Sequence, residues 1–369
     1  MKRVYISVIN DLVTDQRLQR VANLLVDQGL QVTCIGRRLK GSPDTGLVRY
    51  TIRRYRMLIN NGPLFYTCFN TRLFFTLLFA LRPSLFIAND LDTLPASFLA
   101  GRIRGVKLIY DSHEFFTQVP ELIHRKRVQS VWKWIEHRIV PRLEHAVTVS
   151  YPIAEIYRRI HKTSFRVVRN VPVRRSSPGK TEKRKNEKAL IIYQGALNVG
   201  RGLELMIETM KFLDGAVFMI VGTGDIIREL KQLVEEKGVS EKVIFRGRMT
   251  PEELHPLTCS ADLGISLEED LGLNYRYALP NKLFDYIQCR VPVLCSALPE
   301  MAKVVETYGI GIVVHAREPE RLAKTIRFML DERSRGAWME ALEKAAGELC
   351  WENESKEYLA LVNETGVLS

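Results

Sequence analysis

Short, wholly apolar segments alternate with helical patterns along this chain, and that alternation constrains the fold more than any other feature. The first apolar segment is "VYISVI", and a helical pattern follows in which Leu18, Val21 and Leu25 share one face. Fully apolar short strands between helices are typical of a parallel sheet that helices cover on both faces. The sequence therefore predicts an α/β fold.

The alternation runs twice. In the first half the apolar strands are "QVTCIG", "SLFIAND", "VKLIYDSHE", "HAVTVS" and "FRVVRN", and in the second half they include "ALIIYQG", "AVFMIVG", "KVIFRG", "ADLGISL", "VPVLCS" and "GIGIVV". Between the halves, residues 172–188 contain two prolines, much positive charge and almost no large apolar residue, which is typical of a linker. Because 369 residues exceed twice a typical domain, we predict two doubly wound domains with ligands at the carboxyl ends of their strands, in the cleft between the domains.

The charge is distributed unevenly between the two halves. Residues 1–188 contain 34 Lys and Arg against 14 Asp and Glu, whereas residues 189–369 contain 20 against 28. Such asymmetry predicts an anionic partner for the first half. Nucleic acid, an anionic membrane surface or a phosphorylated substrate would each provide that charge.

One apolar segment, Leu64 to Leu81, raises the question of a membrane span. Polar residues at Asn70–Arg72 interrupt it, and the uninterrupted part is about half of the ~20 residues that a spanning helix needs. We therefore predict a helix of the first domain. It either packs in the core or lies at a membrane interface, with "RRYR" at Arg53–Arg56 as a contact to lipid headgroups.

The six cysteines show no paired spacing and no Cys-x-x-Cys, and several lie in apolar segments. This pattern indicates buried, reduced thiols rather than disulfides. The chain begins with Met1 and runs directly into a strand, without the pattern of a secretory signal. We therefore expect a cytoplasmic protein.

Two glycine-containing loops follow strands of the second half. "GALNVGRGLE" begins at Gly195 and offers backbone N–H groups near a helix start, with Arg201 as a fixed cation suited to phosphate oxygens. A glycine-rich turn with a solvated arginine is the alternative. "GTGD" begins at Gly222, but Ile227 stands where a dinucleotide fingerprint has its third glycine, so turn geometry alone also explains this loop.

The segment "ALPNKLFDYI" combines a helix start with a lysine and an aspartate. Pro280 suits the first turn, and Lys282 is a cation where the helix dipole disfavours one, which predicts a bound anion that offsets the cost. Asp285 follows one turn later, and a carboxylate accepts hydrogen bonds from the two hydroxyls of a ribose. The alternative is an exposed Lys–Asp pair on a surface helix.

In the first half, polar residues gather at predicted strand ends. Asp111, His113 and Glu114 follow one strand directly, and Asp90 follows another. Asp11 and Asp15 lie in the loop after the first strand. They are candidate acceptors for sugar hydroxyls, although Asp15 could instead cap the following helix.

The order of these segments resembles the large family of retaining glycosyltransferases with the GT-B fold, often called family 4 or group 1. The resemblance covers nearly the whole chain and rests on "YDSHE", "AVTVS", "VVRNVP", "YQGALNVGRGLE", "MIVGTGD", "ADLGIS", "LPNKLFDYI" and "VPVLCS". It implies an α/β fold of two Rossmann-like domains facing a central cleft. The predicted organisation is an acceptor-side domain at 1–171, the linker at 172–188, a nucleotide-sugar-binding domain at 189–350, and a terminal helix at 351–369 that crosses back to the first domain.

The resemblance also implies roles for individual residues. Arg201 and Lys282 would bind the donor diphosphate, Asp285 the ribose, and His113 the transferred sugar near its reacting carbon. The predicted site residues are His113, Arg201 and Lys282 as catalytic; Gly195, Gly200, Gly222, Gly224, Asn281 and Asp285 as nucleotide-sugar-binding; and Asp11, Asp15, Asp90 and Glu114 as acceptor or sugar contacts.

The chain departs from the family pattern at several positions. Ala196 stands where the family often has an arginine after the glycine turn, and Asn10–Asp11 replaces a double glycine. In the family's paired-glutamate motif, Tyr277 occupies the first position and Asp285 shortens the second. Glu268 and Glu269, earlier in the same loop, are candidates to substitute.

These features together predict a retaining glycosyltransferase of the hexosyltransferase type that uses a UDP- or GDP-sugar. The expected acceptor is lipid-linked or a polysaccharide at the cytoplasmic membrane face, so the enzyme is peripheral there and has no nucleic-acid partner. We expect no cofactor and no metal, since the one Asp-x-Asp, Asp90–Asp92, lies in the non-donor half. The alternatives are a sugar-nucleotide epimerase of the same fold, an NAD-dependent oxidoreductase, which would need the full glycine fingerprint, and a basic anion-binding module without catalysis.

Overall fold

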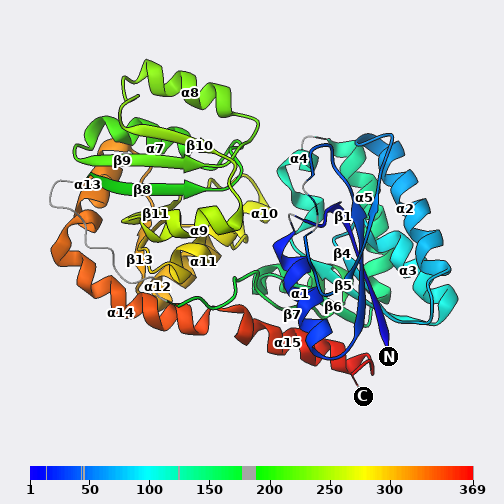
Figure 1. Cartoon of the computed structure of the whole chain (residues 1–369). Coiled ribbons are helices and arrows are strands. Elements are labelled where there is room, and N and C mark those ends of the chain that lie inside the picture. The colour runs from blue at the N-terminus through cyan, green and yellow to red at the C-terminus, as the bar shows by residue number, and fades with distance from the viewer. Residues whose placement is uncertain (14, 43, 45, 124, 177–187, 369) are drawn as a thin grey trace. The chain divides into compact units, whose positions relative to one another are not determined.

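The computed structural model describes residues 1–13, 15–42, 44, 46–123, 125–176 and 188–368. The chain divides into two compact units (Figure 1). Unit 1 comprises Met1–Asn170 and Glu354–Ser369, and unit 2 comprises Val171–Asn353. Residues 177–187 of the predicted linker lie outside the described residues.

Unit 1 is built on a seven-stranded sheet whose recorded strand pairs are all parallel. The order is β3 (Thr51–Tyr55), β2 (Gln31–Arg37), β1 (Arg3–Asp11), β4 (Pro83–Asn89), β5 (Lys107–Ser112), β6 (His145–Thr148) and β7 (Arg166–Val167). In register, Ile6 of β1 lies between Cys34 of β2 and Ile87 of β4. The first six strands follow the order 3-2-1-4-5-6 of a Rossmann fold, whose strand order reverses between β1 and β4.

Helices cover both faces of this sheet. They are α1 (Gln16–Asp27), α2 (Gly62–Leu78), α3 (Leu94–Arg104), α4 (Pro120–Ile123), α5 (Lys126–Ile139) and α6 (Tyr151–His161), with 3-10 turns at Phe116–Gln118 and Val140–Arg142. On one face α2 packs against α3 and α3 against α5, and the rings of Tyr66 and Trp132 meet edge to face at 5.1 Å. Helix α1 lies on the other face (Figure 1).

A buried ion pair fixes α1 to the sheet. The guanidinium of Arg17 reaches Asp111 at the end of β5, with an Nη2–Oδ1 distance of 2.8 Å, and both side chains are almost fully buried. Arg17 also donates to the backbone oxygen of Val168 at 2.9 Å. Because a buried charge is costly unless it is paired, each group depends on the other for its place in the core.

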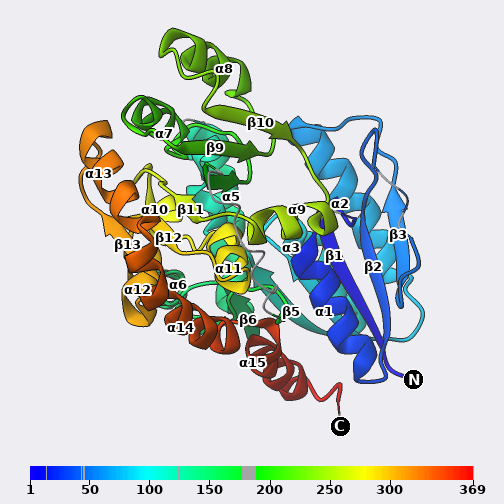
Figure 2. The ribbon, with the colours of Figure 1, turned by 60° about the vertical axis from the view of Figure 1, so that its left-hand side comes forward.

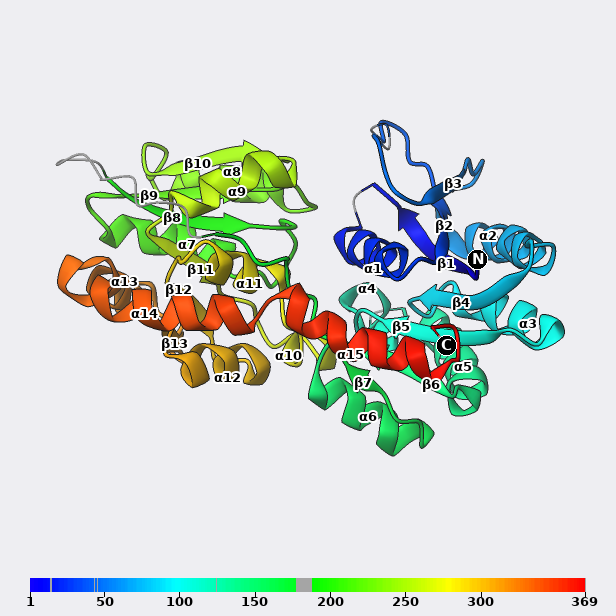
Figure 3. The same ribbon diagram turned by 60° about the horizontal axis from the view of Figure 1, so that its bottom comes forward.

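Helix α15 (Trp351–Glu364) returns to unit 1, which holds Glu354–Ser369 (Figure 3). Glu354 pairs with Arg169 at 2.5 Å, and Arg166 pairs with Glu357 at 3.1 Å and with Glu364. Tyr358 is fully buried, close enough to Asp111 and Arg17 to interact with both electrostatically. Ion pairs and an aromatic side chain thus attach the C-terminal segment to the unit that contains the N-terminus.

Unit 2 repeats the same topology. Its six-stranded sheet has the order β10 (Val243–Gly247), β9 (Ala216–Val221), β8 (Ala189–Gln194), β11 (Leu263–Ser266), β12 (Val293–Ser296) and β13 (Gly311–Val314). The recorded pairs are again parallel, and Ile191 of β8 lies between Leu263 of β11 and Phe218 of β9. This is a second Rossmann order, with its reversal between β8 and β11.

The helices of unit 2 divide between two cores, one on each face of the sheet (Figure 2). One core contains residues from α7 (Leu203–Thr209), α8 (Ile227–Glu236), α13 (Pro319–Leu330) and the 3-10 turn at Met210–Phe212. The other contains residues from α9 (Pro251–Cys259), α11 (Asn281–Gln288), α12 (Pro299–Tyr308) and α14 (Glu332–Glu348). The short helix α10 (Leu273–Arg276) precedes α11. Two parallel sheets covered on both faces confirm the predicted pair of Rossmann-like domains.

The predicted helix near residues 64–81 is α2, and the structure shows what its polar interruption does. Phe65, Phe69 and Leu73 are buried on its inner side. Asn70 donates to the backbone oxygen of Asp92 at 2.8 Å and accepts from the backbone N–H of Ala96 at 3.3 Å. The polar residue therefore ties α2 to the loop after β4. Among the described residues, no helix is both long and apolar enough to span a bilayer.

The interpretation of Arg53–Arg56 as a headgroup contact is wrong in part. Residues 53–55 belong to the edge strand β3, which the sequence analysis missed. Tyr55 is buried, and Arg54 is half-buried with its guanidinium 2.9 Å from the hydroxyl of Ser42. Alternation along a strand sends neighbouring side chains to opposite faces, so the run cannot present four side chains to one surface.

The pair between α1 and β5 gives the first prediction. Replacing Arg17 with leucine leaves the Asp111 carboxylate buried without its guanidinium, and we expect the unfolding free energy of unit 1 to fall by about 3–5 kcal/mol. Thermal melting followed by circular dichroism measures the loss. Arg158→Leu removes an exposed partner of Glu155 and is the matched control, with little change expected. Equal melting temperatures for the two variants would contradict the assigned role of Arg17.

Candidate functional site

The polar residues of unit 2 meet where its strand order reverses. Gly195 directly follows β8, and Glu268 lies two residues after β11. In open parallel sheets the loops at this point diverge, and ligands bind beside the carboxyl ends of the two strands. The residues discussed next lie at this edge.

A buried carboxylate, Glu268, pairs with two cations. Its Oε1 lies 2.5 Å from the Nζ of Lys282 on α11 and 3.8 Å from the Nη1 of Arg201. Its Oε2 accepts a hydrogen bond from the hydroxyl of Ser266 at 2.7 Å. Burial alone would raise the pKa of Glu268, but Lys282, Ser266 and Arg201 together hold that pKa below its usual range. The carboxylate is therefore ionised at neutral pH, and the cluster formed with Lys282 and Arg201 carries a net positive charge.

Aromatic rings support both cations. The ammonium of Lys282 lies 3.9 Å from the centre of the Tyr193 ring, and the guanidinium of Arg201 lies 4.9 Å from that of Tyr275. A cation over a ring face is attracted by the ring quadrupole, most strongly where water is excluded. Lys282 is 6% exposed, whereas Arg201 is half-exposed, so Arg201 is the cation that the surface presents.

The surroundings of Lys282 bear on two sequence interpretations. A bound anion is not needed to explain a lysine in the first turn of α11, because Glu268 already compensates its charge. The alternative of an exposed Lys282–Asp285 surface pair is also wrong, since Lys282 is buried. Of the two candidate substitutes for the missing glutamate, Glu268 joins this cluster, while Glu269 pairs with Arg317 at 3.1 Å.

Asp285 is held by a chain of polar side chains. Gln194, at the end of β8, donates from its amide nitrogen to Oδ2 of Asp285 at 2.8 Å. The hydroxyl of Thr258 on α9 donates to the amide oxygen of Gln194 at 2.7 Å. Gln194 and Thr258 are both buried, whereas Asp285 is half-buried. The chain fixes the carboxylate in one orientation. Asn281 is the exposed first residue of α11, one position before Lys282.

Close packing against the backbone requires glycine at two of the predicted positions, Gly222 and Gly224. A Cβ on Gly222, whose φ is +143°, would lie 1.9 Å from the backbone oxygen of Gly195, and one on Gly224 would lie 2.4 Å from that of Leu197. Gly200 packs against Leu271 in the same way. The N–H of Gly195 donates to Val221 at 3.0 Å and that of Gly222 to Gly247 at 2.8 Å. These two N–H groups are therefore used within the fold, so Gly195 is not one of the exposed donors predicted for its loop.

In unit 1, His113 lies between two carboxylates. Its Nδ1 is 3.5 Å from Oδ2 of Asp90 and its Nε2 is 3.6 Å from Oδ1 of Asp111, while its backbone N–H donates to Oδ1 of Asp90 at 2.9 Å. Burial alone would lower the pKa of His113, but Asp90 and Asp111 outweigh it and raise the pKa to about 9. His113 is therefore an imidazolium at neutral pH, able to donate hydrogen bonds and unable to accept a proton.

Asp90 has an uncommon backbone conformation. Its φ is +60°, in the left-handed region that non-glycine residues seldom adopt, and its N–H donates to the backbone oxygen of Asp111 at 2.9 Å. Strained residues concentrate at functional sites. The sequence places Asp90 at the end of β4, and the structure shows that it orients His113.

The remaining predicted contacts of unit 1 differ in their environment. Asp15 caps α1, since its Oδ1 accepts from the N–H of Leu18 at 2.9 Å, which supports the capping alternative. Asp11 is 2% exposed and accepts from the N–H of Val13 at 3.2 Å, so its side chain has a role within the fold. Glu114 is half-buried next to His113, and its backbone oxygen accepts from the hydroxyl of Ser112 at 2.8 Å.

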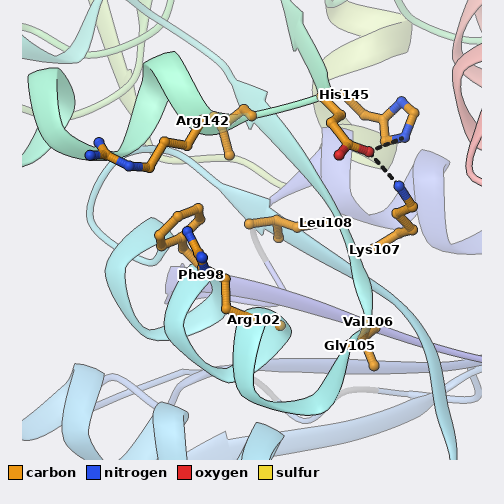
Figure 4. Close-up of a pocket in the computed structure, with 11 residues that line it drawn as sticks. Phe98, Arg102, Gly105, Val106, Lys107, Leu108, Arg142 and His145 are labelled. Carbon is orange, nitrogen blue, oxygen red and sulfur yellow. Dashed lines mark hydrogen bonds and ion pairs between the residues drawn. The ribbon is translucent and has the colours of Figure 1, made fainter.

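A cavity of about 310 Å³ in unit 1 lies away from these residues (Figure 4). It is lined at the start of β5 by Gly105–Leu108 and at the start of β6 by Leu143–His145, with Phe98 and Arg102 from α3. Glu144 pairs there with Lys107. The cavity is at the amino ends of the strands, opposite the edge where ligands of such sheets bind. It therefore does not belong to the site around His113.

Two families match the chain. The family described as "Glycosyltransferase Family 4" matches residues 15–171, and the family described as "Glycosyl transferases group 1" matches residues 176–346. The two matches together account for most of the chain, and they divide it near the boundary between the two units.

Curated relatives match over shorter stretches. The alpha-D-kanosaminyltransferase of Streptomyces kanamyceticus is 20% identical over 255 residues, which are 64% of this chain and 64% of that protein. The GDP-mannose-dependent alpha-(1-6)-phosphatidylinositol monomannoside mannosyltransferase of Mycobacterium tuberculosis is 28% identical over 138 residues, which are 35% of this chain and 34% of that protein. The chain thus aligns with less than two thirds of the length of either relative.

Solved structures match over the whole chain. Sucrose-phosphate synthase from Thermosynechococcus elongatus has a TM-score of 0.78 at 15% identity, with 100% of both chains covered. Anabaena Alr3699/HepE in complex with UDP-glucose has a TM-score of 0.75 at 14% identity, with 99% of this chain and 100% of that chain covered. At these identities the likeness shows the fold.

The charge of His113 gives the second prediction. We expect its imidazole to titrate near pH 9, because both neighbouring carboxylates favour the charged ring. NMR titration of the histidine side chains measures this value, and Asp90→Asn should lower it by removing one negative charge. The charged ring of His113 stabilises the folded state. This contribution is complete below about pH 6.5, the pKa of histidine in the unfolded chain, is still present at neutral pH, and is lost as the pH rises through about 9.

An internal control is available in the same titration. His145 lies in unit 1, and burial lowers its pKa below the ordinary value. The two rings should therefore titrate on opposite sides of neutral pH. A midpoint for His113 below 7 would contradict the assigned ion pairs.

Proposed function

The chain belongs to the glycosyltransferases of group 1 and family 4, and from that premise we propose that it transfers a sugar, with retention, from a UDP- or GDP-sugar to a lipid-linked or glycan acceptor. The observation that carries the proposal is the positively charged cluster of Glu268, Lys282 and Arg201 beside Asp285. It lies at the edge of unit 2 where a sheet of this kind binds nucleotides.

The donor side follows from the charges of this cluster. The diphosphate that leaves with the nucleotide is strongly anionic, and stabilising the charge that develops on it is the largest electrostatic task of the reaction. Arg201 presents a planar guanidinium at the surface, which suits bidentate contacts to phosphate oxygens. Lys282 adds a second cation, and its pairing with Glu268 holds it in place before the donor arrives. We propose that both contact the diphosphate.

Asp285 completes the nucleotide site. Gln194 and Thr258 fix its orientation, and a fixed carboxylate can accept two hydroxyl hydrogen bonds from a ribose. Relatives support the two proposed nucleotides. The Anabaena neighbour was solved with UDP and with UDP-glucose, and the Mycobacterium relative is named as GDP-mannose-dependent.

The chemistry of His113 favours retention. An inverting transfer needs a general base that takes the proton of the attacking hydroxyl on the face opposite the leaving group. An imidazolium with a pKa of about 9 is a poor base at neutral pH, but it can donate a hydrogen bond to a sugar hydroxyl. We therefore propose that His113 positions the transferred sugar, and that Asp90 and Asp111 keep the ring charged for that role.

The acceptor side rests on an exposed apolar surface of unit 1. We call it the outer helical surface. It consists of exposed side chains on α3, on α5, and on and just after α2: Phe75, Phe79, Leu99, Ile103, Val131 and Trp134. Aromatic and aliphatic side chains that alternate with basic ones are typical of helices that lie in a membrane interface.

Charge supports a membrane as the partner of this surface. The helices α2, α3 and α5 contain seven Lys and Arg residues and one acidic residue, Glu136, which is buried. Arg138 lies over the Trp134 ring at 5.5 Å and Arg102 over the Phe98 ring at 5.8 Å, so cations accompany the apolar side chains. Near an anionic leaflet each such cation contributes about 1 kcal/mol. We propose that the outer helical surface binds the membrane that contains a lipid-linked acceptor.

The third prediction concerns the donor. We expect calorimetry to detect binding of UDP or GDP, with CMP and NAD as negative controls. A double variant that combines Lys282→Met with Glu268→Gln should bind the nucleotide about 10–100-fold more weakly. The double variant removes both charges together, so no unpaired group is left buried and the fold should persist. Lys324→Ala, on an exposed position of α13, is the matched control for lost charge. Full affinity in the double variant would exclude Lys282 from the site.

Product analysis separates transfer from epimerisation. With the bound sugar nucleotide and a glycan or polyprenyl phosphosugar acceptor, transfer consumes the acceptor, whereas an epimerase changes the donor alone. The anomeric proton coupling of the product, measured by NMR, reports whether the donor configuration is kept. An inverted product would refute retention while leaving the donor site intact.

The fourth prediction concerns the membrane. The protein should float with vesicles of phosphatidylcholine and phosphatidylglycerol, and binding should weaken with salt and without the anionic lipid. Phe75→Ser with Phe79→Ser should weaken binding about tenfold or more, because each ring contributes up to about 1.5–3 kcal/mol when buried. Phe328→Ser, at an exposed position of α13 in unit 2, is the control. Equal flotation of both variants would refute this surface as the membrane contact.

A further inference from the structure

Two cysteines that are 30 positions apart in the sequence meet in unit 2. Cys259 is the last residue of α9, and Cys289 directly follows α11. Their Sγ atoms are 2.8 Å apart, and both are free thiols. The ring of His255, one turn before Cys259, has its Nδ1 3.2 Å from Sγ of Cys289 and its Nε2 3.6 Å from Sγ of Cys259. Two thiols and an imidazole therefore form one cluster.

The two thiols differ in access and in surroundings. Cys259 is half-exposed at the end of its helix, whereas Cys289 is 3% exposed. The guanidinium groups of Arg175 and Arg290 are close enough to favour a thiolate on Cys259. Oxidant-sensitive cysteines are typically accessible, near positive charge, and adjacent to a second thiol that can resolve the oxidised sulfur.

We propose that Cys259 and Cys289 are an oxidant-reactive pair that a hydroperoxide converts into a disulfide. The proposal is carried by the contact between the two sulfurs and by the imidazole that touches both. Nothing in the proposed transfer reaction uses any of these three residues.

The reaction is a two-electron oxidation. The Cys259 thiolate attacks one oxygen of the peroxide, the O–O bond breaks, and the leaving hydroxide takes a proton to give water and a sulfenic acid. The Cys289 thiol then loses its proton to His255 and attacks the Cys259 sulfur. The S–O bond breaks, and hydroxide leaves with that proton as a second molecule of water. Two thiols and one hydroperoxide thus give one disulfide and two further products. Hydrogen peroxide gives two molecules of water, and an organic hydroperoxide gives one molecule of water and one of an alcohol.

The acidities of the three groups match these roles. The contact with Cys289, followed by the nearby guanidinium groups, lowers the pKa of Cys259, although burial opposes the shift. The same contact and burial raise the pKa of Cys289, which suits a resolving thiol that stays protonated until it reacts. Burial and Arg175 lower the pKa of His255, so its ring is neutral at neutral pH and can accept a proton.

The pair adjoins the residues that hold Asp285. Thr258, the neighbour of Cys259, donates to Gln194, and Gln194 donates to Asp285. The backbone N–H of Cys289 donates to the backbone oxygen of Asp285 at 3.0 Å. A disulfide would link the ends of α9 and α11 directly behind the carboxylate. Oxidation should therefore change nucleotide affinity, an effect that rests on the proposed donor site.

A metal ion fits the same residues less well. Sulfur ligands of tetrahedral zinc each lie about 2.3 Å from the ion, which places two of them about 3.8 Å apart. The sulfurs of Cys259 and Cys289 are closer than that by about an ångström. The neighbouring guanidinium groups also repel a cation. The observations thus favour a bond between the sulfurs over a shared metal.

The test begins with the reduced full-length protein and hydrogen peroxide. We expect an intact mass that is lower by two hydrogen atoms, two fewer alkylatable thiols, and one peptide pair linked through Cys259 and Cys289. Cys259→Ser and Cys289→Ser should each abolish the link. Cys68→Ser, at the exposed cysteine of unit 1, should leave it unchanged. A thiol reductant should restore the starting mass.

The second measurement is UDP and GDP affinity of the reduced and the linked protein. Coupling between the sites predicts a change of about fivefold or more that the reductant reverses. A link without any change in affinity would refute the coupling, although the pair itself would stand. The absence of the link would refute the pair and leave the proposed transferase function untouched, because mass is measured without a donor. Stoichiometric zinc bound through these thiols in the purified protein would also overturn the proposal.

Discussion

The ion pairs of the Glu268 carboxylate are the interaction on which the proposed nucleotide-binding edge of unit 2 depends. Lys282 is buried in the first turn of α11, where the helix dipole opposes a cation, so the position calls for an anionic neighbour. Glu268 supplies that charge and also faces Arg201, which comes from a different loop. One buried carboxylate therefore brings residues from three separate segments together and leaves an excess of one positive charge for a substrate.

Unit 1 also pairs a buried carboxylate with two cations. Asp111 is buried between a permanent cation, Arg17, and a titratable one, His113. Because Arg17 compensates Asp111 and Asp90 faces the other side of the ring, the histidine can stay charged above neutral pH. Removing one cation in either unit would leave the buried carboxylate with only part of its charge compensated, which is more costly than losing the pair entirely.

The sequence predicted the fold from local patterns, because each strand is a short apolar run and a doubly wound topology follows from their alternation with helices. The edge strand β3 was not predicted, since "TIRRY" is half polar and lacks the apolar run that marks the other strands. Lys282, Asp285 and His113 were found because they follow strands or begin a helix.

Their partners were harder to predict. Glu268 was noted only as a candidate substitute for a missing glutamate. The roles of Gln194 and Arg17 depend on partners far along the sequence: Asp285 is 91 positions from Gln194, and Asp111 is 94 positions from Arg17. The meeting of Cys259 with Cys289 was missed for the same reason, since spacing along the chain does not reveal which helix ends meet. A burial pattern predicts that a side chain is inside, but not which charge or thiol it meets there.

Asn70 has a consequence that reaches beyond its two hydrogen bonds. The amide lies in a largely apolar helix and restricts the rotation of α2 about its own axis, because a turn of one residue would break its bond to Asp92 in the loop after β4 and its bond to Ala96 in α3. That loop contains Asp90, which orients His113. The side of α2 that faces outward and the position of His113 are therefore linked through a single polar residue, so a rotation of the helix would disturb the loop that orients the histidine.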